Sequence, residues 1–432
     1  MFNKQKLIAL SLLTAMFTAC SSDEPKIGIE ENEANSYVAK RSIEEAIEIA
    51  SQYADQATAD SRTTGLAVDK TSVSAILSTT SRALNDTLMY AVNFEDNNGY
   101  MIISANKSIE PILAIIDNGN YQDDEQEKVD GFDYFMNAAS DYVQGGIDLR
   151  PGLKPDPDGP VDLIMMIYAD SVEIGRDHEQ RIAVAWGTGS PENIFCENGN
   201  VGCGPVAIAQ VLSYFKPSMS FDVTFEGRPY SHLNLTADDW DGMMLHKRSI
   251  IHSICKASDE QHEKLAVLLR QIGVWTYAQY LTTNETFSYP SYSFSKCNEL
   301  LANKNITFVE QGEFYDNLKD GGVALVQGAD ASKNMVHIWV LDGVASINYR
   351  VTTYTHYNPK THEYLTKEVT LESKKYVHCN WGKSGVKDGY FSESVFNDEA
   401  GTDFKEPLLP QIPDLEPASR NTYTGVYGYV YK

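Results

Sequence analysis

Apolar and polar positions in the first third of the chain alternate in a way that predicts a small unit of helices and strands. Ser42 is followed three residues later by Glu45, a capping box that opens a helix running to about Ala57. Short apolar runs follow, and the turn residues 96–99 separate the first two of them. We expect strands at 87–94, 100–104 and 111–116 and a helix at 130–143 that closes the unit before Gly145.

A proline-rich segment follows this unit. Residues 150–160 hold four prolines, so they can neither continue a helix nor pair in a central strand, and we place the domain boundary in this extended linker. Beyond it, helical patterns come first and strand patterns later, which predicts an α+β domain with a helical half on an antiparallel sheet. We expect helices at 205–215, 259–272, 295–304 and 313–320, and strands at 323–327, 336–341, 346–354, 367–371, 375–380, 389–392 and 422–431.

The first 20 residues have a different character. Lys4 and Lys6 precede a run of thirteen uncharged, mostly apolar residues that ends directly before Cys20. A bilayer span needs about 20 such residues, whereas the shorter run matches the core of a secretory signal peptide. The residues before and at Cys20, Phe-Thr-Ala-Cys, resemble a bacterial lipobox, in which the cysteine becomes the lipidated first residue. We therefore expect a lipoprotein signal peptide at 1–19 and an acidic tether at 20–34.

A lipoprotein signal peptide and a plain cleaved signal peptide both imply a protein that works outside the cytoplasm. The acidic residues after Cys20 resemble the signal that sends some lipoproteins to the cell surface, so we expect an outer-membrane or cell-surface lipoprotein that maturation could release. A plain cleaved signal peptide is the alternative.

Composition and charge exclude several classes of protein. The 432 residues are 42% hydrophobic, which excludes a disordered chain, and the length predicts two to three domains. The net charge of -25 argues against a nucleic-acid partner, because binding a phosphate backbone requires a basic surface. Six cysteines are too few for a disulfide scaffold of this size. No CxxC or HxxxH spacing indicates a metal site, and we expect no cofactor.

Residues 198–212 carry the clearest chemical signal. Cys203 lies between Gly202 and Gly204, and Pro205 is suited to the first turn of the apolar helix that follows. At a helix N-terminus, free N–H groups and the macrodipole lower a thiol pKa, and the same amides can stabilise an oxyanion. Cys203 is therefore a candidate nucleophile. A small buried cysteine in a tight turn is the alternative interpretation.

A thiolate nucleophile for acyl transfer needs a proton shuttle, and histidine is suited to this at neutral pH. His337 lies in an apolar strand 134 residues after Cys203, within the separation of about 130–150 residues found in papain-type enzymes. A histidine buried in the core is the alternative. Asn380 and Trp381 precede a glycine-rich loop, where an amide oxygen can orient an imidazole and an indole can shield it, although a core tryptophan beside a sheet loop fits equally. We interpret His356, His362 and His378 as solvent-facing or incidental.

These segments, in this order, resemble the streptopain family of papain-like cysteine peptidases. The matching residues are Gly202-Cys203, the stretch from His337 to Asp342-Gly343, and Asn380-Trp381-Gly382. Residues 99–107 and 111–114 resemble the family's inhibitory prodomain. The resemblance implies a prodomain at 35–149, the linker at 150–160 and a papain-like peptidase domain at 161–432.

The resemblance also implies a function. It predicts a secreted zymogen that cleaves proteins or peptides through a thioester on Cys203, often with a hydrophobic residue one position before the scissile residue. His337 would be the general base and acid, and Asn380 and Trp381 would orient its imidazole. The prodomain would act as an intramolecular inhibitor until proteolysis, for which Arg150, Lys154, Arg176 and Arg181 are the candidate sites.

Two positions depart from the family's pattern. Thr188 stands where the family has a glutamine that donates to the oxyanion, so the implied oxyanion hole consists of Thr188 and Cys203. Loss of one such donor costs roughly 10²–10³ in rate. Lys383 replaces a tryptophan at the rim of the cleft, and the long interval at 342–376 predicts an added β-hairpin.

The departures leave two alternative functions open. One is a catalytically impaired homologue that acts as a surface binding or interaction lipoprotein, and the other is a thiol acyltransferase that uses the same pair. The remaining cysteines in the exported part are expected to be inert buried thiols, with a bridge between Cys196 and Cys379 as the alternative; the others are Cys255 and Cys297.

Overall fold

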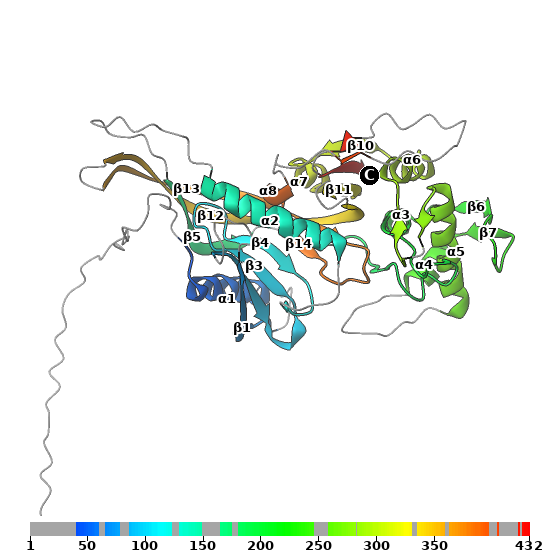
Figure 1. Ribbon diagram of the computed structural model, residues 1–432, viewed down its shortest axis with the longest axis horizontal. Coiled ribbons are helices and arrows are strands. Elements are labelled where there is room, and N and C mark those ends of the chain that lie inside the picture. The colour runs from blue at the N-terminus through cyan, green and yellow to red at the C-terminus, as the bar shows by residue number, and fades with distance from the viewer. Residues whose placement is uncertain are drawn as a thin grey trace, which may run out of the picture. The chain divides into compact units, whose positions relative to one another are not determined.

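The fold is seen in a computed structural model (Figure 1). The structure describes residues 40–59, 65–77, 86–122, 129–148, 165–174, 180–245, 258–281, 283–330, 335–358, 363–396, 404–405, 422–423 and 426–432. The expected signal peptide, the acidic tether and the linker at 150–160 therefore lie outside the described residues, and so does Cys255.

One large, mainly antiparallel sheet connects the N-terminal and C-terminal parts of the described chain (Figure 1). At its centre Ala114 pairs with Phe391 and Ile115 pairs with Tyr390, so the last strand of the first unit lies beside a strand of the second. The strand order is β1 (Val68–Leu77), β2 (Thr87–Phe94), β3 (Tyr100–Ser104), β4 (Ile112–Ile116), β14 (Gly389–Ser392), β13 (Glu363–Asn380), β12 (Met335–Asn358), β11 (Val323–Asp330), β17 (Val426–Tyr431) and β10 (Ile306–Glu310), with β5 (Met165–Ile174) paired to β12.

Some of the helices pack on this sheet and others pack on neighbouring helices, and three small hairpins accompany them. Helices and a large antiparallel sheet together confirm the predicted α+β class. The helices are α1 (Ile43–Ala59), α2 (Asp130–Asp148), α3 (Cys203–Phe215), α4 (Ala237–Met244), α5 (Asp259–Trp275), α6 (Pro290–Leu300), α7 (Phe314–Leu318) and α8 (Glu393–Phe396), and a 3-10 turn covers Glu95–Asn97. The hairpins pair β6 (Met219–Asp222) with β7 (His232–Leu235), β8 (Gln279–Tyr280) with β9 (Thr286–Phe287), and β15 (Phe404–Lys405) with β16 (Thr422–Tyr423).

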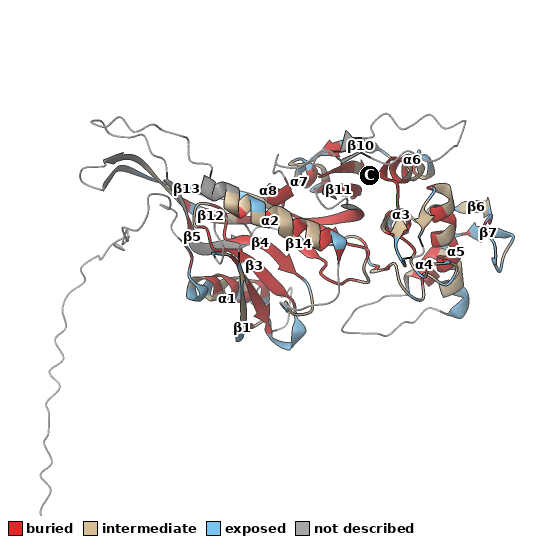
Figure 2. Ribbon diagram, in the orientation of Figure 1, coloured by how far each residue is buried: buried red, intermediate tan, exposed pale blue. Residues whose placement is uncertain are grey.

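The strands of the first unit are covered on both faces, which explains why they read as continuous apolar runs. Every residue of β3 and β4 is buried (Figure 2). Successive side chains of a strand point to opposite faces, so Ile102 packs in one core with α2 whereas Met101 and Ile103 pack in another with α1. This first unit is therefore a three-layered arrangement with the sheet between two helices.

Several elements differ from the sequence-based expectation. The two strands expected at 336–341 and 346–354 are one strand, β12, and those expected at 367–371 and 375–380 are one strand, β13. The added hairpin predicted for 342–376 is therefore present as an extension of these strands. Helix α2 continues past Gly145 to Asp148, since glycine near a helix end costs only about 1 kcal/mol. Strand β1 was not expected, because its positions are mostly half exposed and carry little hydrophobic pattern.

Helix α3, which begins at Cys203, lies in the core of the second unit. All residues from Gly204 to Ser213 are buried, as the apolar sequence predicts. They pack in one hydrophobic cluster with residues of α5, α6 and β11, among them Leu268, Phe294 and Leu325. Because its surroundings are close-packed, α3 can hold its first residue in a fixed position.

Within the described part of the chain, no helix is both long and apolar enough to cross a membrane.

Candidate active site

Cys203 is the first residue of α3. Gly202 precedes it with φ of 93°, a conformation that suits glycine, and it caps the helix. The loop before it is tied down, because Gly202 N donates to Asn200 Oδ1 at 2.9 Å and Val201 N donates to the Thr188 carbonyl at 3.0 Å. Cys203 is partly exposed as a residue, whereas the other described free cysteines, Cys196, Cys297 and Cys379, are buried.

His337 lies on β12 and faces this cysteine. It is 7% exposed, and its ring stacks on Trp339 with centroids 5.9 Å apart and an interplanar angle of 13°. His337 Nε2 lies 3.1 Å from the Trp381 carbonyl oxygen. Because a carbonyl can only accept, this contact assigns the hydrogen to Nε2 and leaves Nδ1 to exchange a proton with the Cys203 sulfur.

Each member of the pair shifts the pKa of the other. Burial opposes ionisation of the Cys203 thiol, but interactions with His337, the Ile338 N–H and Ser288 outweigh it and lower the pKa of Cys203. Burial likewise opposes protonation of His337, but Cys203, the charge of Asp130 and the Trp381 carbonyl outweigh it and raise the pKa of His337. These directions favour a thiolate beside an imidazolium.

The other thiols have the opposite electrostatics. Burial raises the pKa of Cys196 to about 11 and that of Cys297 to about 12, and it raises the pKa of Cys379 well above the ordinary value of a thiol. All three agree with the expectation of inert buried thiols, and each is free, so the alternative of a bridge between Cys196 and Cys379 is not formed.

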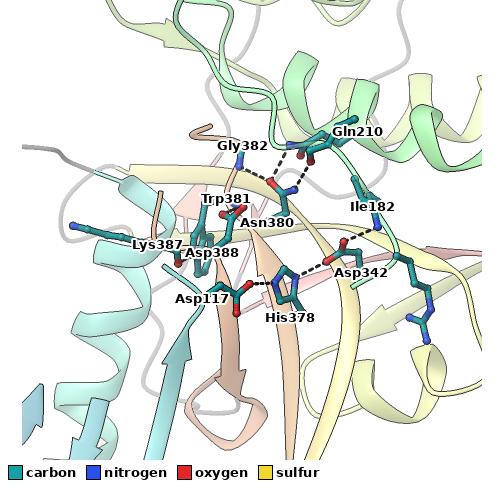
Figure 3. A network of polar contacts seen from close by, with 12 residues as sticks. Asp117, Ile182, Gln210, Asp342, His378, Asn380, Trp381, Gly382, Lys387 and Asp388 are labelled. Carbon is teal, nitrogen blue, oxygen red and sulfur yellow. Dashed lines mark hydrogen bonds and ion pairs between the residues drawn. The ribbon is translucent and has the colours of Figure 1, made fainter. Parts of the chain in front are cut away.

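The Asn380 amide is held by partners other than His337. Its Oδ1 accepts from Gln210 Nε2 at 2.8 Å and from Gly382 N at 3.2 Å, and its Nδ2 donates to the Val184 carbonyl at 3.0 Å (Figure 3). Both ends of the amide are thus occupied away from His337. The expected hydrogen bond from the imidazole to Asn380 is not formed in this structure, and the backbone carbonyl of Trp381 takes its place.

Trp381 is positioned by the glycine-rich loop that follows it. Its backbone N donates to Asp388 Oδ1 at 2.9 Å and its indole Nε1 donates to the Lys387 carbonyl at 2.9 Å. The ring is 1% exposed and lies 6.3 Å from that of His337. Trp381 therefore contributes a carbonyl as well as an indole to the surroundings of the imidazole.

Thr188 lies beside the loop that precedes Cys203. Its carbonyl accepts from Val201 N, and the preceding Gly187 N donates to Glu192 Oε1 at 3.3 Å. Gly187 also faces Ser384, whose Oγ would lie 2.3 Å from a Cβ at that position. These contacts place the Thr188 backbone near Cys203, and its role in an oxyanion hole stays a prediction.

His378 corrects the sequence-based interpretation. It was expected to be solvent-facing or incidental, but its side chain is fully buried between two carboxylates (Figure 3). Its Nδ1 lies 2.6 Å from Asp342 Oδ1 and its Nε2 lies 2.9 Å from Asp117 Oδ2. Burial opposes its charge, but the two carboxylates outweigh burial and raise the pKa of His378 well above its usual value. The sequence could not identify this network, because Asp117 comes from the first unit of the chain.

The first helical turn of α2 covers the candidate site. A Cβ on Gly131 would lie 2.2 Å from Trp381 Cε3 and 2.6 Å from His337 Cδ2, so the backbone of Gly131 touches both rings. Further along the helix, Phe135 packs on Phe391 with ring centroids 4.7 Å apart. The N-terminal unit thus occupies the space in front of His337.

The described residues contain no cluster of side chains of the kind that binds a metal ion. Among the residues that the structure describes, no group of three or more histidine, cysteine, aspartate or glutamate side chains is placed to hold a metal ion. The chemistry that the described groups offer is that of a thiol and an imidazole.

Two protein-family models match the chain. The Peptidase C10 family matches residues 183–391, and the Spi protease inhibitor family matches residues 34–143. Among solved structures, the chain is similar to a mutant fragment of Prevotella intermedia prointerpain A, with 19% identity over 71% of this chain and 90% of that chain and a TM-score of 0.44. It is also similar to active wild-type Prevotella intermedia interpain A cysteine protease, with 17% identity, 64% and 98% coverage and a TM-score of 0.35. A search of curated proteins finds no match.

Fold and family together define a cysteine peptidase that carries an inhibitory domain at its N-terminus. The chain carries a Peptidase C10 domain, the domain of the streptopain family, and this peptidase domain follows a Spi-type inhibitor prodomain.

Proposed function

We propose that this peptidase is a secreted or surface-anchored endopeptidase, made as a zymogen, with Cys203 as its nucleophile and His337 as its general base and acid. The observation that carries the proposal is the pairing at the start of α3: a partly exposed cysteine with a lowered pKa faces an imidazole with a raised one. The Trp381 carbonyl fixes the tautomer that this chemistry requires.

The reaction then follows in two stages. The Cys203 thiolate attacks the carbonyl carbon of the scissile peptide, and the Cys203 N–H and Thr188 are proposed to stabilise the oxyanion. The His337 imidazolium gives its proton to the leaving amine, which leaves a thioester on Cys203 and a neutral imidazole. Neutral His337 next takes a proton from water, whose hydroxide attacks the thioester and releases the acid and the thiolate.

Inhibition by the prodomain is explained by the position of α2. Gly131 lies against the rings of His337 and Trp381, where a substrate has to reach the sulfur. Asp130 adds a negative charge that helps to raise the pKa of His337. We infer that the prodomain blocks the site sterically and leaves the cysteine and histidine already paired beneath it.

Gly131→Ala is expected to weaken this block. A methyl group at this position overlaps both rings, and overpacking of a tight contact costs about 1–3 kcal/mol. The hydrolysis of a small peptide by the uncut chain should therefore rise about tenfold, because 1.4 kcal/mol corresponds to a factor of ten. Asp141→Ala, on an exposed position of the same helix, is the control. Equal rates for the two variants, with both chains confirmed uncut, would refute the proposed block.

The maturation cut is proposed to precede Arg181. The Arg181 guanidinium donates to the Leu318 carbonyl at 2.8 Å and to the Gly322 carbonyl at 3.2 Å, and its backbone N donates to the Asp342 carbonyl. A protease needs an extended, accessible segment, and these bonds hold the backbone to the peptidase domain. The remaining candidates, Arg150, Lys154 and Arg176, lie outside the described residues. N-terminal sequencing of the active form distinguishes the sites.

The anchor is proposed from the sequence alone. Cys20 follows an apolar signal segment and a lipobox-like tripeptide. Parent protein expressed in a bacterial host with labelled fatty acid should carry the label and sediment with membranes, and Cys20→Ser should lose both properties. An unlabelled parent protein would favour the plain signal peptide.

A protein substrate tests the endopeptidase assignment against its alternatives. The processed chain is incubated with an unfolded protein and a primary amine, and the products are analysed by mass spectrometry. Internal cleavage with free carboxyl ends is expected. Products that carry the amine in preference to a carboxyl group would identify an acyltransferase. No cleavage at all would favour the impaired homologue. The observation that supports this alternative is Thr188, which stands where the family has a glutamine.

A further inference from the structure

The loop that carries the nucleophile is bound along its length by the segment 284–288. Asn198 Nδ2 donates to the Glu285 carbonyl at 2.7 Å, and Asn200 Nδ2 donates to the Asn284 carbonyl at 3.1 Å. In return, Thr286 Oγ1 donates to the Asn200 carbonyl at 2.8 Å. These bonds fix one segment against the other, so the residue that follows Phe287 has a defined position beside α3.

That residue is Ser288, which lies at the nucleophile itself. It is 4% exposed, and its Oγ accepts from the Gly204 N–H at 3.1 Å. A Cβ on Gly202 would lie 3.1 Å from this Oγ, and one on Gly204 would lie 2.9 Å from the Ser288 Cβ. The glycines on both sides of Cys203 therefore let the serine approach this closely.

The contact with Gly204 determines what the hydroxyl can do. A serine hydroxyl has one proton to donate, and the Gly204 N–H occupies its acceptor side. The proton is thus available to a neighbouring acceptor, and the hydroxyl is one of the groups that lower the pKa of the Cys203 thiol. A hydrogen bond donated to the charged form of a group favours that form.

We propose that Ser288 is a positioning residue for the nucleophile: its buried hydroxyl accepts from the Gly204 N–H and donates to the Cys203 thiolate. The inference rests on the proposed role of Cys203. During acylation the imidazolium gives up its proton to the leaving amine, and during deacylation the sulfur departs as a thiolate. Ser288 is a donor to sulfur that does not depend on the protonation state of His337.

The pH dependence of alkylation measures this contribution in the processed chain. The rate at which iodoacetamide alkylates Cys203 follows the thiolate fraction. A hydrogen bond to a charged group is worth about 1.5 kcal/mol, so Ser288→Ala should raise the apparent pKa of Cys203 by about one unit and slow alkylation about tenfold below that pKa. Above both pKa values the two rates should converge, which a general loss of structure does not produce.

Thr286→Val is the matched control. It removes the bond to the Asn200 carbonyl and the bond accepted from Asn198 Nδ2 while it preserves the side-chain shape, and it does not remove a donor from the sulfur. Its alkylation profile should keep the parent's apparent pKa. A Ser288→Ala profile that superimposes on the parent's would overturn the inference, and so would an equal shift in Thr286→Val. A parent protein whose Cys203 is not alkylated at any pH would instead refute the proposed nucleophile, so the two failures are distinguishable.

Discussion

Cys203→Ala is expected to abolish peptide hydrolysis by the processed chain while the fold is retained. Cys203 is partly exposed at the first position of α3, so its removal leaves no large cavity, and His337 can lose its proton once its partner is gone. The chemistry depends on a nucleophile that alanine lacks, and removal of such a group lowers kcat by about 10⁴-fold or more. Initial rates on a peptide substrate, measured after complete removal of the prodomain, give the comparison.

Cys196→Ala is the matched control for this prediction. Cys196 is also a free cysteine close in sequence to the nucleophile loop, but it is 8% exposed and burial raises its pKa to about 11. The variant should hydrolyse the same peptide at nearly the parent's rate. Hydrolysis by Cys203→Ala at a rate similar to that of Cys196→Ala would remove Cys203 from the mechanism.

Asp342→Ala is expected to cause the largest loss of stability. Asp342 is fully buried, and its carboxylate holds His378 at 2.6 Å and accepts from the Ile182 N–H at 2.9 Å. The substitution leaves a buried imidazolium and a buried N–H without this partner, and breaking a buried pair in this way costs about 3–5 kcal/mol. Urea unfolding of the uncut chain near pH 6 measures the change in the free energy of unfolding.

Asp117→Ala removes the carboxylate on the other side of the same imidazole. The side chain of Asp117 is 37% exposed, and it belongs to the prodomain rather than to the peptidase domain. Solvent screens this pair, so its loss should cost much less than that of Asp342. A cost equal to that of Asp342→Ala would contradict the distinction between the buried and the exposed partner.

The network also predicts how the stability of the uncut chain changes with pH. His378 is faced by Asp342, Asp117 and Asp388 and by the ring of Tyr390. Because the folded-state pKa of His378 is raised, its stabilising effect is complete below about 6.5, the ordinary value, and is lost as pH rises through the folded value. Burial raises the pKa of Asp388 to about 8, so the folded chain keeps Asp388 protonated at pH values where the unfolded chain ionises it. This difference also lowers the stability as pH rises toward 8. The free energy of unfolding should therefore fall as pH is raised from 6 to 9, and an increase would contradict this account.

The sequence predicts that Cys203 and His337 lie together better than it predicts what surrounds them. Glycines and proline around Cys203 determine a helix start locally, and the apolar strand around His337 determines burial. The orientation of the Asn380 amide cannot be predicted locally, because Gln210 binds one end of it, Val184 binds the other, and both residues lie far away in sequence. A residue type indicates what a side chain can bind, whereas the tertiary fold decides which partner it meets.

The same reasoning explains why the sequence did not predict the burial of His378. A histidine beside a tyrosine- and threonine-rich stretch reads as a half-exposed strand position, and the sequence of β13 does not indicate that His378 has a charged partner. Its burial depends on β4, which pairs with β14 and brings Asp117, 261 residues earlier in the sequence, beside His378. Gly131 was missed for a related reason, since its contact with His337 requires the docking of α2 from the prodomain.

Competition among the cysteines for an epoxide thiol-protease inhibitor tests the central claim most directly. The processed chain is treated at neutral pH with less than one equivalent of inhibitor, and peptide mapping locates the adduct. We predict modification at Cys203, where the residue is partly exposed and its pKa is lowered, and none at Cys196, Cys297 or Cys379, where burial raises the pKa. An adduct spread evenly over the cysteines, or found on another one, would contradict the assignment of Cys203 as the nucleophile.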